Sequence, residues 1–280
     1  MAIRLANARG RAVLVVGDAI ADVERASSGR FGADPMAALA GWDEFAAWAA
    51  GVGAGAATGR LDESMLDAPV PRPAKVFAIG LNYKSHAEEA GLPLPGKPMV
   101  FTKFQNCLSG PRADVRLSSD FVDWEVELVV VIGRRGKTIS EARAFDHVAG
   151  YTVGQDISDR KLQFSDQPAQ FSMGKSLDGF GPLGPAVVSL DAVADPNDLG
   201  LTCDVAGERM QSARSSDMVF GVAPLVAYLS GLCTLEPGDI IFTGTPAGIG
   251  SVRQPRRYLQ AGETIVSTIE SIGTLTNKCI

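Results

Sequence analysis

The sequence predicts an α+β protein that is rich in β-structure and carries a small α/β appendage at its N-terminus. Over residues 74–280, short runs of β-branched and aromatic residues are separated by Gly and Pro, and helical patterns are fewer. This pattern is typical of a mixed or antiparallel sheet. Three prolines within residues 69–73 form a stiff, extended linker. We therefore expect one domain over residues 1–70 and a larger one over residues 71–280.

Local patterns predict the individual elements. Strands are expected at residues 3–7, 11–17, 76–80, 124–132, 149–155, 201–205, 239–243 and 264–269. Helices are expected at residues 83–90, 139–145 and 217–230. Asp34 before Pro35 predicts the start of a further helix, because Asp caps a helix and Pro fits its first turn. Trp42, Phe45 and Trp48 recur every three residues and predict one apolar helix face.

Charge and hydropathy exclude several classes of function. The 280 residues include 26 Lys and Arg against 32 Asp and Glu, a net charge of −6, which argues against nucleic acid as a partner. No apolar stretch approaches the roughly 20 residues that span a bilayer, and the run at residues 12–16 is too short for a secretion signal. The four cysteines form no C-x-x-C pair and are expected to be reduced. We therefore expect a cytoplasmic protein that binds neither nucleic acid nor membrane.

The most informative segment is the predicted strand VDWEVELVVVI at residues 122–132. Glu125 and Glu127 share one face of this strand, and beyond them the run is apolar on both faces. Two like charges at the mouth of a buried strand repel each other, and a divalent cation would relieve the repulsion. Asp156 directly follows another predicted strand. Three carboxylates without a nearby His favour Mg²⁺ or Mn²⁺, with Ca²⁺ as an alternative. The competing interpretation is a solvent-exposed strand end.

A second candidate group lies in the segment GLNYKSHAEEAG at residues 80–91. His86 and Glu89 are three residues apart and therefore share one face of the predicted helix, whereas Glu88 points elsewhere. A carboxylate beside an imidazole orients the ring and raises its basicity, which is the arrangement of a general base that activates water. The competing interpretation is a surface His–Glu pair.

Two glycine-containing segments do not support nucleotide binding. The Gly-Lys-Ser string that contains Lys175 would need a glycine at position 169 to form a phosphate-binding loop, but that position is Ala169. Residues 243–250 follow a predicted strand and are glycine-rich, but Pro246 interrupts them. We expect no nucleotide and no organic cofactor.

Taken together, five ordered segments resemble the fumarylacetoacetate hydrolase family, in the short form found in acylpyruvate hydrolases and 2-hydroxyhepta-2,4-diene-1,7-dioate isomerases. The resemblance covers roughly residues 75–279. It is carried by residues 80–83 with His86, and by residues 123–127, 155–158, 174–176 and 243–246. One departure is the segment at residues 103–106, where relatives often have prolines that shape the entry of the pocket.

The resemblance implies a mixed β-sandwich roll for the catalytic domain, a homodimer, and a Mg²⁺ or Mn²⁺ site. It implies metal ligands Glu125, Glu127 and Asp156, a His86–Glu89 dyad, and substrate contacts at Arg160, Gln163, Lys175 and Thr245. The segment at residues 157–172 resembles the mobile lid of the family. No motif assigns a role to the N-terminal 70 residues.

From these residues we expect a metal-dependent hydrolase that cleaves a C–C bond in a 2,4-dioxo acid of the acylpyruvate type. His86, oriented by Glu89, would activate water, and the metal and Lys175 would stabilise a pyruvate enolate. Arg160 would hold a substrate carboxylate. Oxaloacetate decarboxylation and hydroxydienedioate isomerisation are alternatives on the same site, because both involve similar charge development. A non-catalytic metal-binding scaffold is a further alternative.

Overall fold

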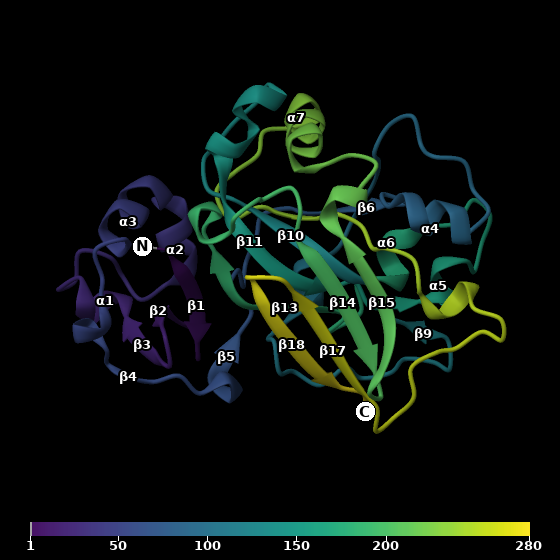
Figure 1. Cartoon of the computed structure of the whole chain (residues 1–280), viewed down its shortest axis with the longest axis horizontal. Helices are drawn as coiled ribbons and strands as arrows, with labels where there is room; N and C mark the ends of the chain where they lie inside the picture. The colour runs from purple at the N-terminus through teal and green to yellow at the C-terminus, as the bar shows by residue number, and fades with distance from the viewer. Residues whose placement is uncertain (1) are drawn as a thin grey trace.

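One large sheet forms the centre of the computed structural model, which describes residues 2–280 (Figure 1). The order of its strands is β4 (Gly59–Arg60), β3 (Ala19–Asp22), β2 (Arg11–Val16), β1 (Arg4–Ala8), β13 (Gly181–Val188), β11 (Val148–Gln155), β10 (Val126–Ile132), β16 (Ile240–Phe242), β6 (Val76–Gly80) and β7 (Met99–Thr102). β5 (Leu66–Asp67) pairs with β1, and β8 (Leu108–Ser109) pairs with β13. Neighbouring strands are antiparallel, except for the parallel pairs β16–β6 and β13–β8.

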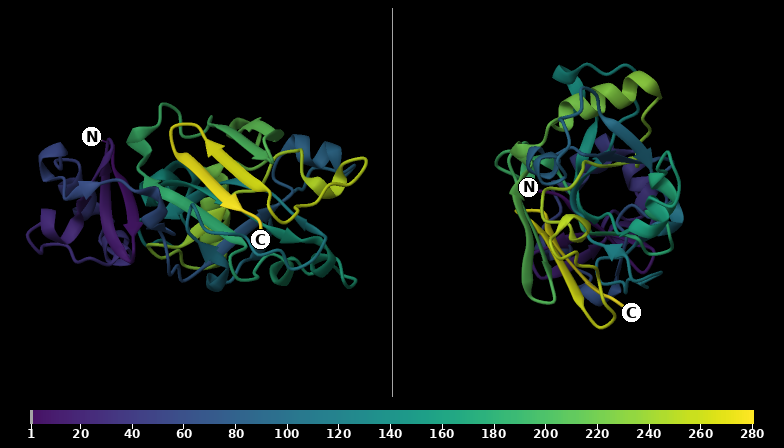
Figure 2. Two further views of the ribbon diagram at one scale, coloured as in Figure 1. Left: turned by 90° about the horizontal axis from the view of Figure 1, so that it is seen from below. Right: turned by 90° about the vertical axis from the view of Figure 1, so that its right-hand side faces the viewer.

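A second, antiparallel sheet packs against the first. It consists of β15 (Glu208–Arg214), β14 (Gly200–Val205), β17 (Thr264–Ile269) and β18 (Gly273–Lys278). β9 (Val122–Asp123) and β12 (Ser158–Asp159) form a short separate pair. Figure 2 shows the strands curling around one another in the right-hand view. The predicted β-rich α+β fold with a mixed sheet is confirmed.

Strand β10 is buried on both faces, as its continuous apolar run predicts. On one face Leu128 belongs to a core cluster with Leu201 and Ile265 of the second sheet. On the other face Val129 belongs to a cluster that includes Phe45 of the N-terminal unit. The strand that carries the acidic segment is therefore held rigidly between two hydrophobic cores.

The N-terminal unit contains α1 (Val23–Ala26), α2 (Pro35–Ala40) and α3 (Trp42–Ala49). Asp34 caps α2 through its side chain, as predicted, and Pro35 occupies the first turn. Trp42 and Phe45 are buried on one face of α3. β1 pairs with β13, so the strands of this unit continue the large sheet. A domain boundary near residue 70 remains a prediction.

The remaining α-helices lie in two places, with α7 (Val222–Leu232) apart from the other three (Figure 1). The other three are α4 (Lys84–Glu89), α5 (Arg160–Gln163) and α6 (Phe171–Gly174). Shorter 3-10 helices lie at Ala54–Ala56, Glu63–Met65, Gln105–Cys107, Glu141–His147, Leu190–Ala192, Ser215–Asp217 and Gly250–Val252. Within residues 2–280, no helix combines the length and the apolar character needed to cross a membrane.

Three predicted elements differ clearly from the structure. The helix expected at residues 217–230 begins only at Val222, because Ser215–Asp217 forms a short 3-10 helix before it. The helix expected at residues 139–145 is a 3-10 helix at Glu141–His147. The strand expected over the segment at residues 122–132 is interrupted, because β9 ends at Asp123 and β10 begins at Val126. The reason for the interruption is local: the backbone N–H of Glu125 donates to the side-chain oxygen of Gln155 at 2.9 Å and not to a neighbouring strand.

Candidate active site

The three predicted metal ligands meet at one end of β10 and β11. β11 ends at Gln155, so Asp156 follows it directly, and its N–H donates to the carbonyl of Glu125 at 2.9 Å. One carboxylate oxygen from each of Glu125, Glu127 and Asp156 lies within 4.8 Å of the others, and all three residues are buried. The interpretation as a solvent-exposed strand end is therefore wrong for this cluster, which we call the acidic triad.

Three cationic side chains face the acidic triad. Lys175 Nζ donates to Glu125 Oε2 and to Asp156 Oδ2, at 2.7 Å in each case. Lys103 Nζ donates to Asp156 Oδ1 at 2.7 Å, and Arg160 Nη2 donates to Glu125 Oε1 at 2.6 Å. All three cationic side chains are buried, so these ion pairs are shielded from water.

The pKa values of the two glutamates of the acidic triad are shifted in opposite directions. Burial opposes ionisation of Glu125, but the charges of Lys175 and Arg160 outweigh it and lower the pKa of Glu125 to about 2. Burial and the nearby charges of Asp156 and Glu125 raise the pKa of Glu127 well above its usual value. Among the described residues, Glu127 is the carboxyl group of the triad without a direct ion pair to a cationic side chain.

The donor chemistry of the acidic triad fits a hard divalent cation. Together with Asp123 the site holds four carboxyl groups against three cationic side chains, so ionisation of all four would leave one negative charge for a bound cation to compensate. Carboxylate oxygens without imidazole or thiolate are the ligands that Mg²⁺ and Mn²⁺ prefer. Glu125, Glu127 and Asp156 are the residues that would hold such an ion.

Asp123 organises the wall beside the triad. Its carboxylate accepts N–H groups from Gly250 at 2.7 Å and from Ser251 at 3.0 Å. It also accepts Nε of Arg160 at 2.9 Å. A Cβ on Gly250 would lie 1.8 Å from the carbonyl oxygen of Arg257, so only glycine fits this close approach. Asp123 therefore fixes both the loop at residues 250–252 and the guanidinium of Arg160.

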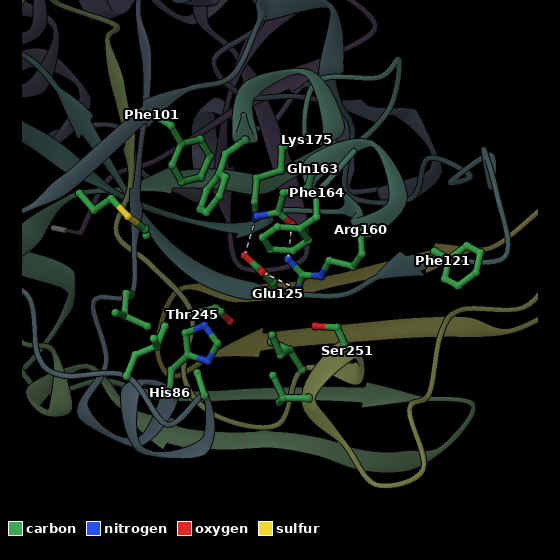
Figure 3. Close-up of a pocket in the computed structure, with 18 of the residues that line it drawn as sticks. His86, Phe101, Phe121, Glu125, Arg160, Gln163, Phe164, Lys175, Thr245 and Ser251 are labelled. Carbon is green, nitrogen blue, oxygen red and sulfur yellow. Dashed lines mark hydrogen bonds and ion pairs between the residues drawn. The ribbon is translucent and has the colours of Figure 1, made fainter. Parts of the chain in front are cut away.

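The predicted dyad is formed on helix α4. His86 Nδ1 and Glu89 Oε1 are 2.9 Å apart, and Glu89 Oε2 accepts the N–H of Gly248 at 2.9 Å. Because a carboxylate only accepts hydrogen bonds, Nδ1 is the protonated nitrogen and Nε2 carries the lone pair. The imidazole of His86 lines the cavity opposite Lys175 (Figure 3). This geometry suits a base that takes a proton at Nε2.

Arg160, Gln163 and Thr245 also line the cavity. Arg160 is bound to Asp123, Glu125 and, through Nη1, to Gln163 Oε1 at 2.9 Å. These hydrogen bonds use three of its five N–H groups, and Nη2 also lies 2.8 Å from Asp123 Oδ2. A substrate carboxylate would compete with these protein partners for the guanidinium, and this role remains a prediction. Thr245 Oγ1 donates to the carbonyl of Val126 at 2.9 Å.

Seven of the residues described above line one cavity of about 730 Å³ (Figure 3): His86, Glu125, Glu127, Arg160, Gln163, Lys175 and Thr245. The segment predicted as a lid, residues 157–172, supplies part of its wall through α5 and α6. Four phenylalanines also line it: Phe101, Phe121, Phe164 and Phe171. A cavity of this size, with polar groups converging at one end, is typical of a small-molecule site.

Sequence reasoning missed two contributors to this site. Lys103 is 3% exposed and donates to the carbonyls of Lys175 and Phe180 as well as to Asp156. Asp123 was part of a recognised segment but had no assigned role. The sequence feature that could have identified Lys103 is its position directly after the strand β7. A lysine that enters the interior at a strand end needs a carboxylate partner.

Comparisons with known proteins place the chain in one family. The profile of the family described as fumarylacetoacetate (FAA) hydrolase, C-terminal, matches residues 75–280. The mitochondrial oxaloacetate tautomerase FAHD2B of Bos taurus is 46% identical over 215 residues, which are 76% of this chain and 68% of that protein. A crystal structure from Mycobacterium smegmatis has a TM-score of 0.94 and 46% identity, with 99% of both chains covered.

A further solved structure contains ligands. It is maleylpyruvate hydrolase from Sphingobium sp. SYK-6 in complex with manganese(II) and pyruvate, with a TM-score of 0.82 and 29% identity over 99% of this chain and 98% of that chain. The family profile covers most of the chain, and the bovine relative is similar over most of its own length. The chain belongs to the fumarylacetoacetate hydrolase family of enzymes.

Proposed function

We propose that the chain is a divalent-metal-dependent hydrolase that cleaves the C–C bond of a 2,4-dioxo acid of the acylpyruvate type. The observation that carries the proposal is that Glu125 and Glu127, Lys175 and His86 line the same cavity. Asp156 is bonded to Lys175, and Glu89 is bonded to His86. A metal site, a cationic charge stabiliser and a general base are the groups that this reaction requires.

The acidic triad would hold Mg²⁺ or Mn²⁺, and Ca²⁺ is compatible with the same oxygen donors. When bound, the ion would supply Lewis acidity toward the oxygens of a 2-oxo acid. Support comes from the maleylpyruvate hydrolase structure that contains manganese(II) and pyruvate. Homodimer formation belongs to the same proposal, since it rests on the family resemblance.

His86 acts as the general base in this proposal. It takes a proton from water at Nε2, and the resulting hydroxide attacks C4, the acyl carbonyl carbon. The C3–C4 bond breaks, its electron pair passes to the pyruvate part as an enolate, and the acyl part leaves as a carboxylic acid. Protonated His86 then returns the proton to C3, which gives pyruvate. Glu89 stabilises the imidazolium that forms between these steps.

Lys175 stabilises the enolate charge. Its Nζ lies at the polar end of the cavity, between Glu125 and Asp156. A cationic donor in a buried site is effective, because little reorientation of solvent is needed as the charge develops. Lys103 does not line the cavity; it positions Asp156 and the backbone of Lys175.

A second candidate is proton transfer on oxaloacetate without cleavage by water. The observation that favours it is the 46% identity to a protein named as an oxaloacetate tautomerase. In this reaction His86 would move a proton between C3 and the enol oxygen, with Lys175 in the same role. Oxaloacetate decarboxylation and hydroxydienedioate isomerisation involve similar charge development at the same residues.

A substrate panel separates these candidates. The metal-loaded enzyme is assayed with acetylpyruvate, fumarylpyruvate and oxaloacetate in Mg²⁺ or Mn²⁺, and again after EDTA. The hydrolase proposal expects pyruvate and a carboxylic acid from an acylpyruvate, and no product after EDTA. Loss of the enol absorbance of oxaloacetate, with both acylpyruvates intact, would replace the first candidate by the second. No reaction with any of the three would reject both.

A further inference from the structure

The cavity has two chemically different ends. Its polar end is formed by Glu125 and Glu127 of the acidic triad with Lys175, Arg160 and His86. The rest of the lining is mainly apolar, and its larger side chains are Leu92, Met99, Phe101, Phe121, Phe164, Phe171 and Tyr258. The volume of about 730 Å³ lies within the range of sites for drug-sized ligands, about 300–1,000 Å³. A four-carbon acid at the polar end would leave the apolar end without an occupant.

The aromatic rings of the apolar end form two groups. Phe171 packs edge-to-face against Phe101, with ring centroids 5.6 Å apart, and against Phe164 at 5.9 Å. Phe121 packs edge-to-face against Tyr258 at 5.4 Å. Edge-to-face packing holds the rings in defined orientations, which makes both groups ready-made contact surfaces.

Part of this aromatic surface faces solvent. Phe164 is 52% exposed and Phe121 is 42% exposed, although both line the cavity (Figure 3). Large apolar side chains that remain exposed around a concave site indicate a surface that a ligand covers. A ligand with an apolar ring would remove this surface from water.

A second carboxylate on the substrate would have only exposed cationic side chains as partners in this cavity. The buried cations Lys103, Arg160 and Lys175 are already paired with protein carboxylates. Among the described residues, the other cationic side chains that line the cavity are Lys161 and Arg256, and both are exposed. Ion pairs with exposed cations contribute little, because water and salt screen them.

We propose that the apolar end of the cavity binds an apolar, ring-sized substituent of the substrate, so that the preferred 2-oxo acid carries one carboxylate and an aryl-type distal group. This inference rests on the proposed function, which places the 2-oxo acid head at the acidic triad. It distinguishes the chain from relatives whose names specify oxaloacetate or maleylpyruvate, both of which are dicarboxylates.

Binding of three 2-oxo acids to the Mg²⁺-loaded enzyme tests the inference by calorimetry. Pyruvate reports on the head group alone, 4-phenyl-2-oxobutanoate adds a distal ring, and 2-oxoglutarate adds a distal carboxylate. None of the three is a 2,4-dioxo acid, so none undergoes the proposed cleavage. We expect the phenyl compound to bind at least about 10-fold more tightly than either of the others, because ring burial adds apolar contact.

The outcomes separate the two proposals. Metal-dependent binding of pyruvate together with equal or tighter binding of 2-oxoglutarate than of the phenyl compound would overturn the inference and leave the proposed function standing. Failure of all three acids to bind in the presence of Mg²⁺ would overturn both proposals, because no head-group site would then exist.

Binding to single-substitution variants tests where the phenyl ring of the ligand lies. Phe121→Ala and Phe164→Ala should each weaken binding of 4-phenyl-2-oxobutanoate about 5-fold and leave pyruvate binding unchanged. Both side chains are about half exposed, so their removal is not expected to prevent folding. Phe104→Ala is the matched control, because Phe104 is 47% exposed and lies outside the cavity lining. An equal loss for the control, or for pyruvate, would contradict the placement of the ring.

Discussion

Glu127 differs from the other carboxylates of the acidic triad in what faces it. Glu125 and Asp156 each pair with two cationic side chains. In the described part of the chain, the hydrogen bond recorded for Glu127 comes from the N–H of Gly244, at 2.7 Å. An uncompensated buried carboxylate opposes folding and favours a cation. The carboxylate of Glu127 is therefore expected to increase metal affinity and to lower the stability of the metal-free fold.

Glu127→Gln should separate these two effects. The amide oxygen can still accept the N–H of Gly244, but the negative charge is lost. We expect Mn²⁺ affinity to fall by more than the roughly 10- to 100-fold typical of an outer-shell change, because a direct ligand is removed. We expect the free energy of unfolding of the metal-free protein to stay equal or rise. Calorimetric titration with Mn²⁺ and urea unfolding measure the two quantities, and unchanged Mn²⁺ affinity would contradict the site.

Substitutions of His86 and of its neighbours on helix α4 test whether His86 is the general base. His86→Ala should lower kcat for acylpyruvate hydrolysis about 100-fold or more, because water loses its base. Glu89→Gln should also lower kcat, because the imidazolium loses its carboxylate partner. Glu88→Gln is the matched control: Glu88 is exposed on the same helix and has no recorded contact with the imidazole. If Glu88→Gln and Glu89→Gln have the same kcat, the dyad has no catalytic role.

At the level of elements, the parallel pair β16–β6 carries two loops of the site. β6 ends at Gly80, just before the segment that contains His86, and β16 leads into Thr245. Asp239 secures the start of both strands. Its buried carboxylate accepts the N–H groups of Lys75 at 2.9 Å and Glu236 at 2.7 Å, and pairs with Lys75 Nζ at 2.8 Å.

Asp239→Ala should therefore destabilise the fold. Two backbone N–H groups lose their acceptor, so we expect a loss of about 2–4 kcal/mol in the free energy of unfolding. Urea unfolding measures the loss, with Asp114→Ala as a control, because Asp114 is exposed and has no recorded side-chain hydrogen bond. A loss no larger than that of the control would show that Asp239 does not secure these strands.

The pH dependence of stability is tested at the start of α1. Asp22 caps this helix, and the hydrogen bond from Arg11 lowers the pKa of Asp22 below its usual value. A lowered carboxyl pKa stabilises the fold above the unfolded pKa, and this contribution is lost as pH falls through the folded value. Asp22→Asn keeps a capping side chain but removes the charge.

We expect Asp22→Asn to cost about 0.5–1 kcal/mol near neutral pH, which is the range for a partly exposed ion pair. The difference between wild type and variant should shrink when unfolding is measured at about pH 3, where the unfolded carboxyl is protonated. A difference that is the same at both pH values would show that the ion pair contributes nothing.

Strands with a clear hydrophobic pattern could be predicted from the sequence. Strand ends that depend on a distant side-chain contact could not. β6 begins and ends where its apolar run predicts, and β11 differs by one residue. The break between β9 and β10 was not predictable, because it depends on the side chain of Gln155, which lies 30 residues further along the chain. The 3-10 geometry at Glu141–His147 was missed because its apolar spacing also suits an α-helix.

On the scale of the whole molecule, the sequence indicated which residues gather but not how the cavity is lined. The acidic triad follows from strand ends and period-2 alternation, and the dyad follows from helical spacing. Lys103 contacts groups that lie 53 and 72 residues away, and such contacts leave no periodic pattern. The same holds for the aromatic rings of the cavity, which come from separate parts of the chain.

The whole-molecule assignments of cytoplasmic location and homodimer formation remain predictions. The bovine relative is named as mitochondrial, and that description applies to that protein. Strand β1 of the N-terminal unit is bonded to β13, and the core of this unit is continuous with β10. These contacts link the unit to the strands that hold the acidic triad.

The most direct test of the central claim is a Mn²⁺ titration of the metal-free enzyme during acetylpyruvate hydrolysis, with acetate and pyruvate followed by NMR. We predict no hydrolysis in EDTA, and a rate that rises with Mn²⁺ until one ion is bound per chain. Equal amounts of acetate and pyruvate should form, because one C–C bond is cleaved in each turnover. Hydrolysis at full rate in EDTA, or no acetate at saturating Mn²⁺, would contradict the account.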